Sequence, residues 1–132
     1  MSLIVYLIDD DEVFNTLNAA IIEFVDPAIR VRVFKSGEEV MEHLNANHET
    51  QAPDLVFLDI RMPNMDGFEL LDTIGLMAKN PFVNSKVYML SSTLNEKDLI
   101  RTRQYPIISS FLGKPLTVEL FREIIDTMNV GD

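Results

Sequence analysis

The sequence predicts one α/β domain, a doubly wound five-stranded parallel sheet with helices on both faces. Five short apolar runs alternate with five helical patterns along the chain, and this alternation is typical of parallel strands joined by right-handed crossovers. The length of 132 residues fits a single domain with its own core. We therefore expect one domain over residues 1–132, with no output domain attached.

The five predicted strands are short runs rich in apolar and β-branched residues, each followed by polar or turn residues. The first and third runs are unbroken, which is typical of parallel strands buried on both faces. The third ends on an acid, Asp59, and the turn residues Pro63, Asn64 and Gly67 follow it. The predicted strands cover residues 3–8, 31–34, 55–58, 86–90 and part of 107–112.

The first and last helices show the clearest apolar faces. The first is expected to begin at Glu12 and to stop at residues 26–27, where proline follows aspartate. The last begins after a capping threonine, Thr117. Apolar spacing of three to four residues predicts the inward faces: Val13, Leu17, Ile21 and Phe24 in the first helix, and Val118, Phe121, Ile125 and Met128 in the last.

The three middle helices are marked mainly by their ends. A capping box of Ser36 and Glu39 opens the second, which continues to about residue 44. The third runs from residue 67 to about 79, with Asp66 as its cap. The fourth, over residues 95–104, has a thin apolar face and is expected to be weakly anchored. The apolar residues of that face are Leu94, Leu99 and Ile100.

Composition excludes several kinds of site. The chain has 21 acidic and 11 basic residues and a formal net charge of −10, which argues against direct contact with nucleic acid and fits a bound cation or a basic partner. It has no cysteine and only two histidines, so thiolate or histidine-rich metal sites are not expected. Without a signal peptide or an apolar run of about 18 residues, we expect a cytoplasmic protein with no membrane insertion.

Polar residues follow four of the five predicted strands. Asp9 and Asp10 follow the first, Asp59 ends the third, Ser91 follows the fourth and Lys114 the fifth. The carboxyl ends of parallel strands meet at one edge of the sheet, where open α/β proteins bind their ligands. Three carboxylates crowded there call for a cation, and oxygen ligands next to phosphate chemistry favour Mg²⁺.

The same residues fit phosphoryl transfer to Asp59. Its carboxylate, expected to be ionised at neutral pH and so to need no general base, attacks phosphorus in line. The metal neutralises the carboxylate and phosphoryl oxygens. The Ser91 hydroxyl and the Lys114 ammonium receive the equatorial oxygens.

Four segments, in order, resemble the response-regulator receiver domain of two-component signalling. They are residues 8–11 (Ile-Asp-Asp-Asp), 53–68 (Pro-Asp-Leu-Val-Phe-Leu-Asp-Ile-Arg-Met-Pro-Asn-Met-Asp-Gly-Phe), 89–92 (Met-Leu-Ser-Ser) and 111–115 (Phe-Leu-Gly-Lys-Pro). The resemblance covers nearly the whole chain. It implies a flavodoxin-like strand order, 2-1-3-4-5, and a stand-alone signalling regulator rather than an enzyme.

The resemblance also implies roles for the acidic residues. Asp59 would be the phosphoacceptor, and the donor would be a phosphohistidine on a histidine kinase or a histidine phosphotransfer protein. Asp10, Asp59 and the backbone carbonyl of Arg61 would bind Mg²⁺, with Asp9 acting through water. The peptide bond between Lys114 and the following proline is expected to be cis.

A conformational switch is implied as well. Ser91 would move toward the phosphoryl group, and Phe111 would turn inward into the vacated space. The surface of the fourth helix, fifth strand and fifth helix would then change shape, act on a downstream protein partner and offer a face for oligomers. Phe14 lies outside the apolar stripe of the first helix, so a docking contact for the kinase and a wider buried face are equally open.

The chain departs from the family in two places. Residues 105–110 replace the Gly-Ala that often precedes the fifth strand, so the fourth helix is expected to end early. Arg61 and Thr93 stand two residues after Asp59 and Ser91, and neither is an acid or amide able to orient an attacking water. This predicts slow self-dephosphorylation.

Two other function classes fit part of the pattern. A Mg²⁺-dependent phosphatase of the haloacid-dehalogenase type also forms an aspartyl phosphate, but it needs an acid where this chain has Arg61. A non-phosphorylated interaction module would keep the fold without needing the complete set of acids, hydroxyl and lysine. The complete set favours the phosphoacceptor.

Overall fold

The computed structural model describes residues 3–46, 52–93 and 95–129 and contains a five-stranded, all-parallel sheet in the order β2-β1-β3-β4-β5. The predicted fold class and strand order are confirmed, and every predicted strand lies within one residue of the observed bounds. The strands are β1 (Ile4–Ile8), β2 (Arg30–Phe34), β3 (Leu55–Asp59), β4 (Lys86–Ser91) and β5 (Ile108–Gly113).

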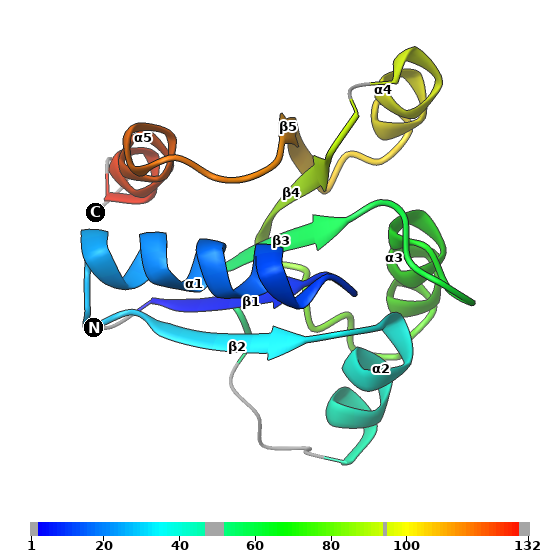
Figure 1. Ribbon diagram of the computed structural model, residues 1–132. Helices are drawn as coiled ribbons and strands as arrows, with labels where there is room; N and C mark the ends of the chain where they lie inside the picture. The colour runs from blue at the N-terminus through cyan, green and yellow to red at the C-terminus, as the bar shows by residue number, and fades with distance from the viewer. Residues whose placement is uncertain (1–2, 47–51, 94, 130–132) are drawn as a thin grey trace.

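Helices cover both faces of the sheet (Figure 1). One face carries α1 (Glu12–Val25) and α5 (Val118–Asn129), and the other carries α2 (Gly37–Ala46) and α3 (Gly67–Gly75). The short helix α4 (Glu96–Thr102) lies beside β5. Within the described residues, no helix combines the length and the apolar character that a bilayer crossing needs.

Adjacent residues of the central strands point into different cores, because side chains alternate across a strand. Tyr6 and Leu58 join the core under α2 and α3, whereas Leu7 and Phe57 join the core under α1 and α5. All four side chains are at most 1% exposed. The strands that end in Asp59 and just before Asp9 are therefore packed on both sides, which fixes the position of their carboxyl ends.

The predicted inward face of α1 is wrong for three of its four residues, and only Ile21 packs against the core. Val13, Leu17 and Phe24 are 66%, 45% and 70% exposed. The helix instead turns a different face to the sheet, with three buried residues: Asn15, Asn18 and Ile22. The two asparagines form hydrogen bonds with backbone groups at the sheet edge, and the same face buries Ile22 in the core. In α5, Phe121 is buried as predicted, together with Ile124.

Two helices are shorter than predicted. α3 ends at Gly75 rather than near residue 79. After it, the N–H groups of Leu76 and Met77 each donate to a carbonyl three residues earlier in the chain. Leu76 is 88% exposed, whereas Met77 still packs against the core under α2 and α3. α4 ends at Thr102, earlier than the predicted residue 104, in the direction that the departure before β5 suggested. Leu94 lies outside the described residues.

The predicted caps are confirmed. Asp66 caps α3 in a full capping box with Glu69, and the Thr117 hydroxyl accepts the Leu120 N–H at 3.1 Å. At α2 the Ser36 hydroxyl accepts the Glu39 N–H at 3.0 Å. The Glu39 carboxylate accepts a bond from the N–H of the residue before Ser36, so this box is shifted by one position.

Candidate functional site

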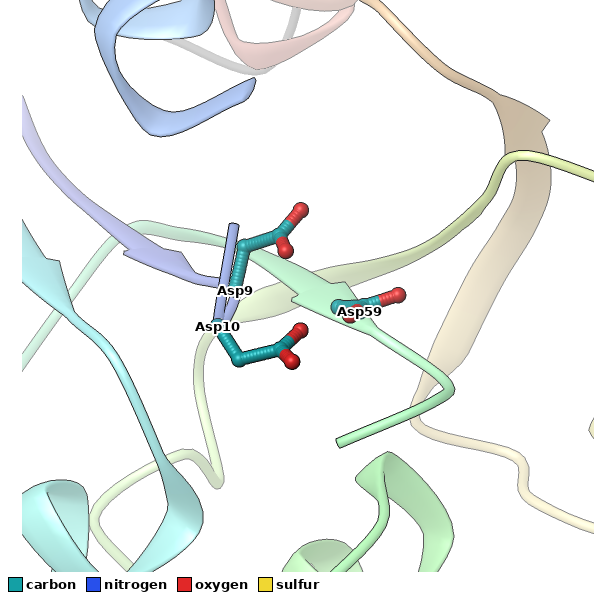
Figure 2. Close-up of side chains that lie close together, drawn as sticks. All are labelled: Asp9, Asp10 and Asp59. Carbon is teal, nitrogen blue, oxygen red and sulfur yellow. The ribbon is translucent and has the colours of Figure 1, made fainter. Parts of the chain in front are cut away.

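Three carboxylates converge at the carboxyl edge of the sheet. Oxygen atoms of Asp9, Asp10 and Asp59 all lie within 4.8 Å of one another. Asp9 and Asp59 are 2% and 3% exposed, whereas Asp10 is exposed. Figure 2 shows the three side chains pointing to the same side, from the ends of β1 and β3. This oxygen-rich group is suited to a hard divalent cation.

Lys114 reaches the same carboxylates from the end of β5. Its ammonium nitrogen lies 2.7 Å from Asp9 Oδ2 and 3.0 Å from Asp59 Oδ1, and its side chain is 6% exposed. Burial lowers the pKa of Lys114, but the hydrogen bonds to Asp9 and Asp59 outweigh burial and raise it. The ammonium is therefore charged at neutral pH. The Phe14 ring lies under it, 4.7 Å from nitrogen to centroid, so Phe14 belongs to the wall of this site.

The charge of Asp59 depends on what surrounds it. Burial and the neighbouring Asp9 raise the pKa of Asp59 to about 7, although Lys114 acts in the opposite direction. With the protein's own groups alone, burial and Asp9 therefore favour the protonated form of Asp59 more than the sequence suggested. A cation at the three carboxylates would favour the ionised form.

The segment after Asp59 is held close to it. The Gly67 N–H donates to the Ile60 carbonyl at 2.9 Å, and a Cβ on Gly67 would lie 2.6 Å from the Asp59 carbonyl oxygen. Only glycine fits there. Asn64 adopts φ 69°, a left-handed conformation that asparagine tolerates. The Arg61 N–H donates to Asp59 Oδ1 at 3.3 Å.

Ser91 and Lys114 are joined at the same edge. Ser91 ends β4 next to the strand of Asp59, and its carbonyl accepts the Lys114 N–H at 2.9 Å. Ser91 is 3% exposed, and its hydroxyl donates to the Thr93 carbonyl at 2.6 Å. Phe111 is half-buried against the core under α2 and α3. The predicted cis bond between Lys114 and Pro115 is confirmed.

A family model for the response regulator receiver domain matches residues 5–126. The chain belongs to this family. This receiver domain is 28% identical over 125 residues to hybrid signal transduction histidine kinase K of Dictyostelium discoideum, an alignment that covers 91% of this chain and 10% of the kinase. It is 25% identical over 126 residues to the probable methanogenesis regulatory protein FilR2 of Methanothrix harundinacea (strain 6Ac). This alignment covers 93% of this chain and 79% of FilR2.

The fold is similar to that of a two-component response regulator from Cytophaga hutchinsonii. The TM-score is 0.85 at 27% identity, and the match covers 96% of this chain and 97% of that one. The receiver domain spans about a tenth of the length of the Dictyostelium kinase, where it resembles one part of a longer protein. The chain is thus a receiver domain of two-component signalling.

Sequence reasoning missed two polar residues of α1 that contact this site's backbone. The Asn15 amide donates to the Asp9 carbonyl at 2.8 Å, and the Asn18 amide oxygen accepts the Leu116 N–H at 3.0 Å. Their spacing of three residues places them on one helix face. That spacing was the available signal, and the stronger apolar stripe concealed it.

A second missed contact links the segment after Asp59 to α4. The Arg61 guanidinium lies 2.7 Å from Asp98 Oδ2, and Asp98 is 7% exposed. The guanidinium of Arg101, on α4, lies over the Phe68 ring, with Cζ 4.3 Å from the ring centroid. Its Nη1 atom lies 3.8 Å from Asp66 Oδ2. The receiver domain therefore holds α4 against the start of α3 through arginines.

Proposed function

We propose that this receiver domain accepts a phosphoryl group on Asp59 from a phosphohistidine of a histidine kinase or a histidine phosphotransfer protein. The observation that carries the proposal is the convergence of one buried ammonium, from Lys114, and two further carboxylates on a single carboxyl group. Such a site receives a phosphoryl group with two negative charges poorly by itself and well with a cation. A cytoplasmic location fits this role.

Asp10, Asp59 and the backbone carbonyl of Arg61 would hold Mg²⁺, with Asp9 acting through water. When bound, Mg²⁺ supplies charge neutralisation of the carboxylate and phosphoryl oxygens. An Asp59 oxygen attacks phosphorus in line, the bond from phosphorus to the donor nitrogen breaks, and its electron pair remains on the imidazole. The Lys114 ammonium, which contacts the Asp59 carboxylate before the reaction, then donates a hydrogen bond to a phosphoryl oxygen.

The new negative charge would act on a bistable region. The Ser91 hydroxyl, which donates to the Thr93 carbonyl at 2.6 Å, exchanges that partner for a phosphoryl oxygen. Phe111, half-buried on β5, turns into the vacated space. The surface of α4, β5 and α5, with Leu99 and Ile100 exposed on α4, then changes and controls a downstream protein partner or an oligomer.

The phosphorylated state should be long-lived. Water attack on an acyl phosphate needs a group that orients the water, and the position two residues after Asp59 is arginine. Its guanidinium pairs with Asp98 at 2.7 Å. Thr93, two residues after Ser91, supplies its backbone carbonyl and N–H to the Ser91 hydroxyl.

A phosphorylation assay tests the proposal. Wild type and Asp59→Asn are incubated with acetyl phosphate and Mg²⁺ and analysed by intact mass spectrometry. We expect one phosphoryl group on the wild type, none on the variant, and none when a chelator removes the metal. Steady release of inorganic phosphate with rapid turnover would support the phosphatase of the haloacid-dehalogenase type instead. No labelling under any condition would support the interaction module.

A further inference from the structure

Two asparagines of α1 are buried where an apolar residue would be the simpler choice. Asn15 is 4% exposed and Asn18 1% exposed, while Val13 and Leu17 of the same helix face solvent. Burying an amide is unfavourable unless it gains hydrogen bonds. The hydrogen bonds of these amides therefore act together with the burial of Ile22 in orienting α1.

The partners lie in the two segments that carry the opposite charges of the site. The Asn15 amide donates to the carbonyl of Asp9 at 2.8 Å. The Asn18 amide oxygen accepts the N–H of Leu116, two residues after Lys114, at 3.0 Å. Both bonds are buried, so neither competes with bulk water.

These contacts close a ring. From α1 it passes through Asn15 to Asp9, across the 2.7 Å ion pair to Lys114, along the chain to Leu116, and through Asn18 back to α1. Leu116 is 1% exposed in the core under α1 and α5. One turn of helix thus sets the separation of the segments that hold the carboxylate and the ammonium.

We propose that Asn15 and Asn18 are positioning residues for phosphoryl transfer, which fix the segments of Asp9 and Lys114 so that the ammonium meets Asp59 and the incoming phosphoryl group. The inference rests on the proposed phosphorylation of Asp59. Neither amide touches the reacting atoms. Their loss should slow phosphoryl transfer without abolishing it.

The test compares Asn18→Leu, which removes the acceptor at similar size, with Asn18→Asp, which keeps it. Phosphorylation by acetyl phosphate with Mg²⁺ is followed by mass spectrometry, and hydrogen exchange of the Leu116 amide by NMR. We expect about tenfold slower phosphorylation for Asn18→Leu, as a displacement of well under 1 Å would cause. Fast exchange should be confined to Leu116 and its neighbours, and Asn18→Asp should restore both properties.

Ser85→Ala is the matched control. The buried Ser85 hydroxyl donates to the Pro53 carbonyl at 2.6 Å at the opposite edge of the sheet, so this change removes a bond of the same kind far from the site. We expect a similar fall in melting temperature with an unchanged phosphorylation rate.

A wild-type rate in Asn18→Leu, or equal slowing in Ser85→Ala, would overturn the inference. If Asn18→Leu does not fold, Asn18→Ala removes the acceptor without adding volume and is judged by the same two readouts. Absence of labelling in the wild type would count against the phosphorylation of Asp59 itself, whereas normal labelling of every variant counts only against the asparagines.

Discussion

Helices α1 and α4 both bury polar residues and expose apolar ones, but different forces connect them to the site. α1 is connected through the buried amides of Asn15 and Asn18. α4 is connected through an ion pair of Asp98 with Arg61, whose side chain is 68% exposed. A charge added at Asp59 acts on an ion pair far more than on a buried amide bond. If Asp59 is phosphorylated as proposed, this difference predicts that α1 stays in place as a support and that α4 moves.

The burial pattern of α4 supports this view. Its two buried residues are Asp98 and Thr102, while Leu99 and Ile100 are 40% and 50% exposed. Apolar burial therefore contributes little to its attachment. Partly exposed ion pairs contribute about 1 kcal/mol or less each, so a modest electrostatic change is enough to reposition this helix.

The largest effect should come from removing the ammonium of Lys114, which lies in the segment that Asn18 of α1 holds in place. Lys114→Met leaves Asp9 and Asp59 buried without a cation, and breaking a buried pair costs about 3–5 kcal/mol. We expect such a loss in urea unfolding at pH 8, and at least about 100-fold slower phosphorylation. The control is Lys35→Met, whose partner Glu12 is exposed and which should change neither quantity. Equal effects of the two changes would contradict the buried pairing.

Asp59→Asn should stabilise the protein, and the effect depends on pH. The pKa of Asp59 is about 7 in the fold and about 4 when unfolded, so its contribution to stability is present below pH 4 and is lost as the pH rises to 7. The full difference is about 4 kcal/mol. Because a bond to Lys114 is also lost, we expect about 2 kcal/mol of added stability at pH 8 without Mg²⁺ and almost none at pH 4.

Urea unfolding of wild type and variant at the two pH values, with a chelator, measures this difference. Mg²⁺ should then stabilise the wild type and reduce the advantage of the variant. The prediction fails if the variant is less stable than wild type at pH 8. It also fails if the gain in stability is the same at both pH values, because the carboxyl group of Asp59 would then not have a raised pKa in the fold.

Asp98→Asn tests the attachment of α4 directly. The change removes the charge that pairs with Arg61 and should lower the free energy of unfolding by only about 1 kcal/mol. Amide hydrogen exchange should become faster in α4 and remain unchanged in α1. Glu12→Gln, which breaks an exposed pair, is the control. Faster exchange in both helices would remove the distinction between them.

The smallest effect should come from the exposed apolar residues. Leu17→Gln on α1 and Leu99→Gln on α4 alter side chains that are 45% and 40% exposed. We expect each to change the free energy of unfolding by no more than about 0.5 kcal/mol in thermal or urea unfolding. A large loss from Leu99→Gln alone would show that apolar contacts, rather than arginines, hold α4.

The sheet and the cluster at its edge could be predicted because they depend on local signals. Strand runs, caps such as Asp66 and the positions of Asp9, Asp59 and Lys114 at strand ends are all visible within a few residues. Parallel topology then brings the strand ends together. The strand order and the roles of the acidic residues came from the resemblance of four segments to the receiver family.

The features that were missed depend on contacts between distant parts of the chain. The orientation of α1 follows from the bond of Asn18 to Leu116, 98 residues away, and Arg61 meets Asp98 across 37 residues. The raised pKa of Asp59 depends on burial and on Asp9. Spacing along the sequence shows neither distance nor burial, so the apolar stripe of α1 was the more visible and the misleading signal.

The close approach of Gly67 to Asp59 has a consequence for how this protein can evolve. Since a methyl group there would overlap the Asp59 carbonyl oxygen, even alanine would force the backbone of the proposed phosphoacceptor to shift. Descendants of this chain can vary the exposed residues of α1 and α4 and so acquire new partners. Gly67 cannot be replaced in the same way, because any side chain there would require the backbone at the end of β3 to move.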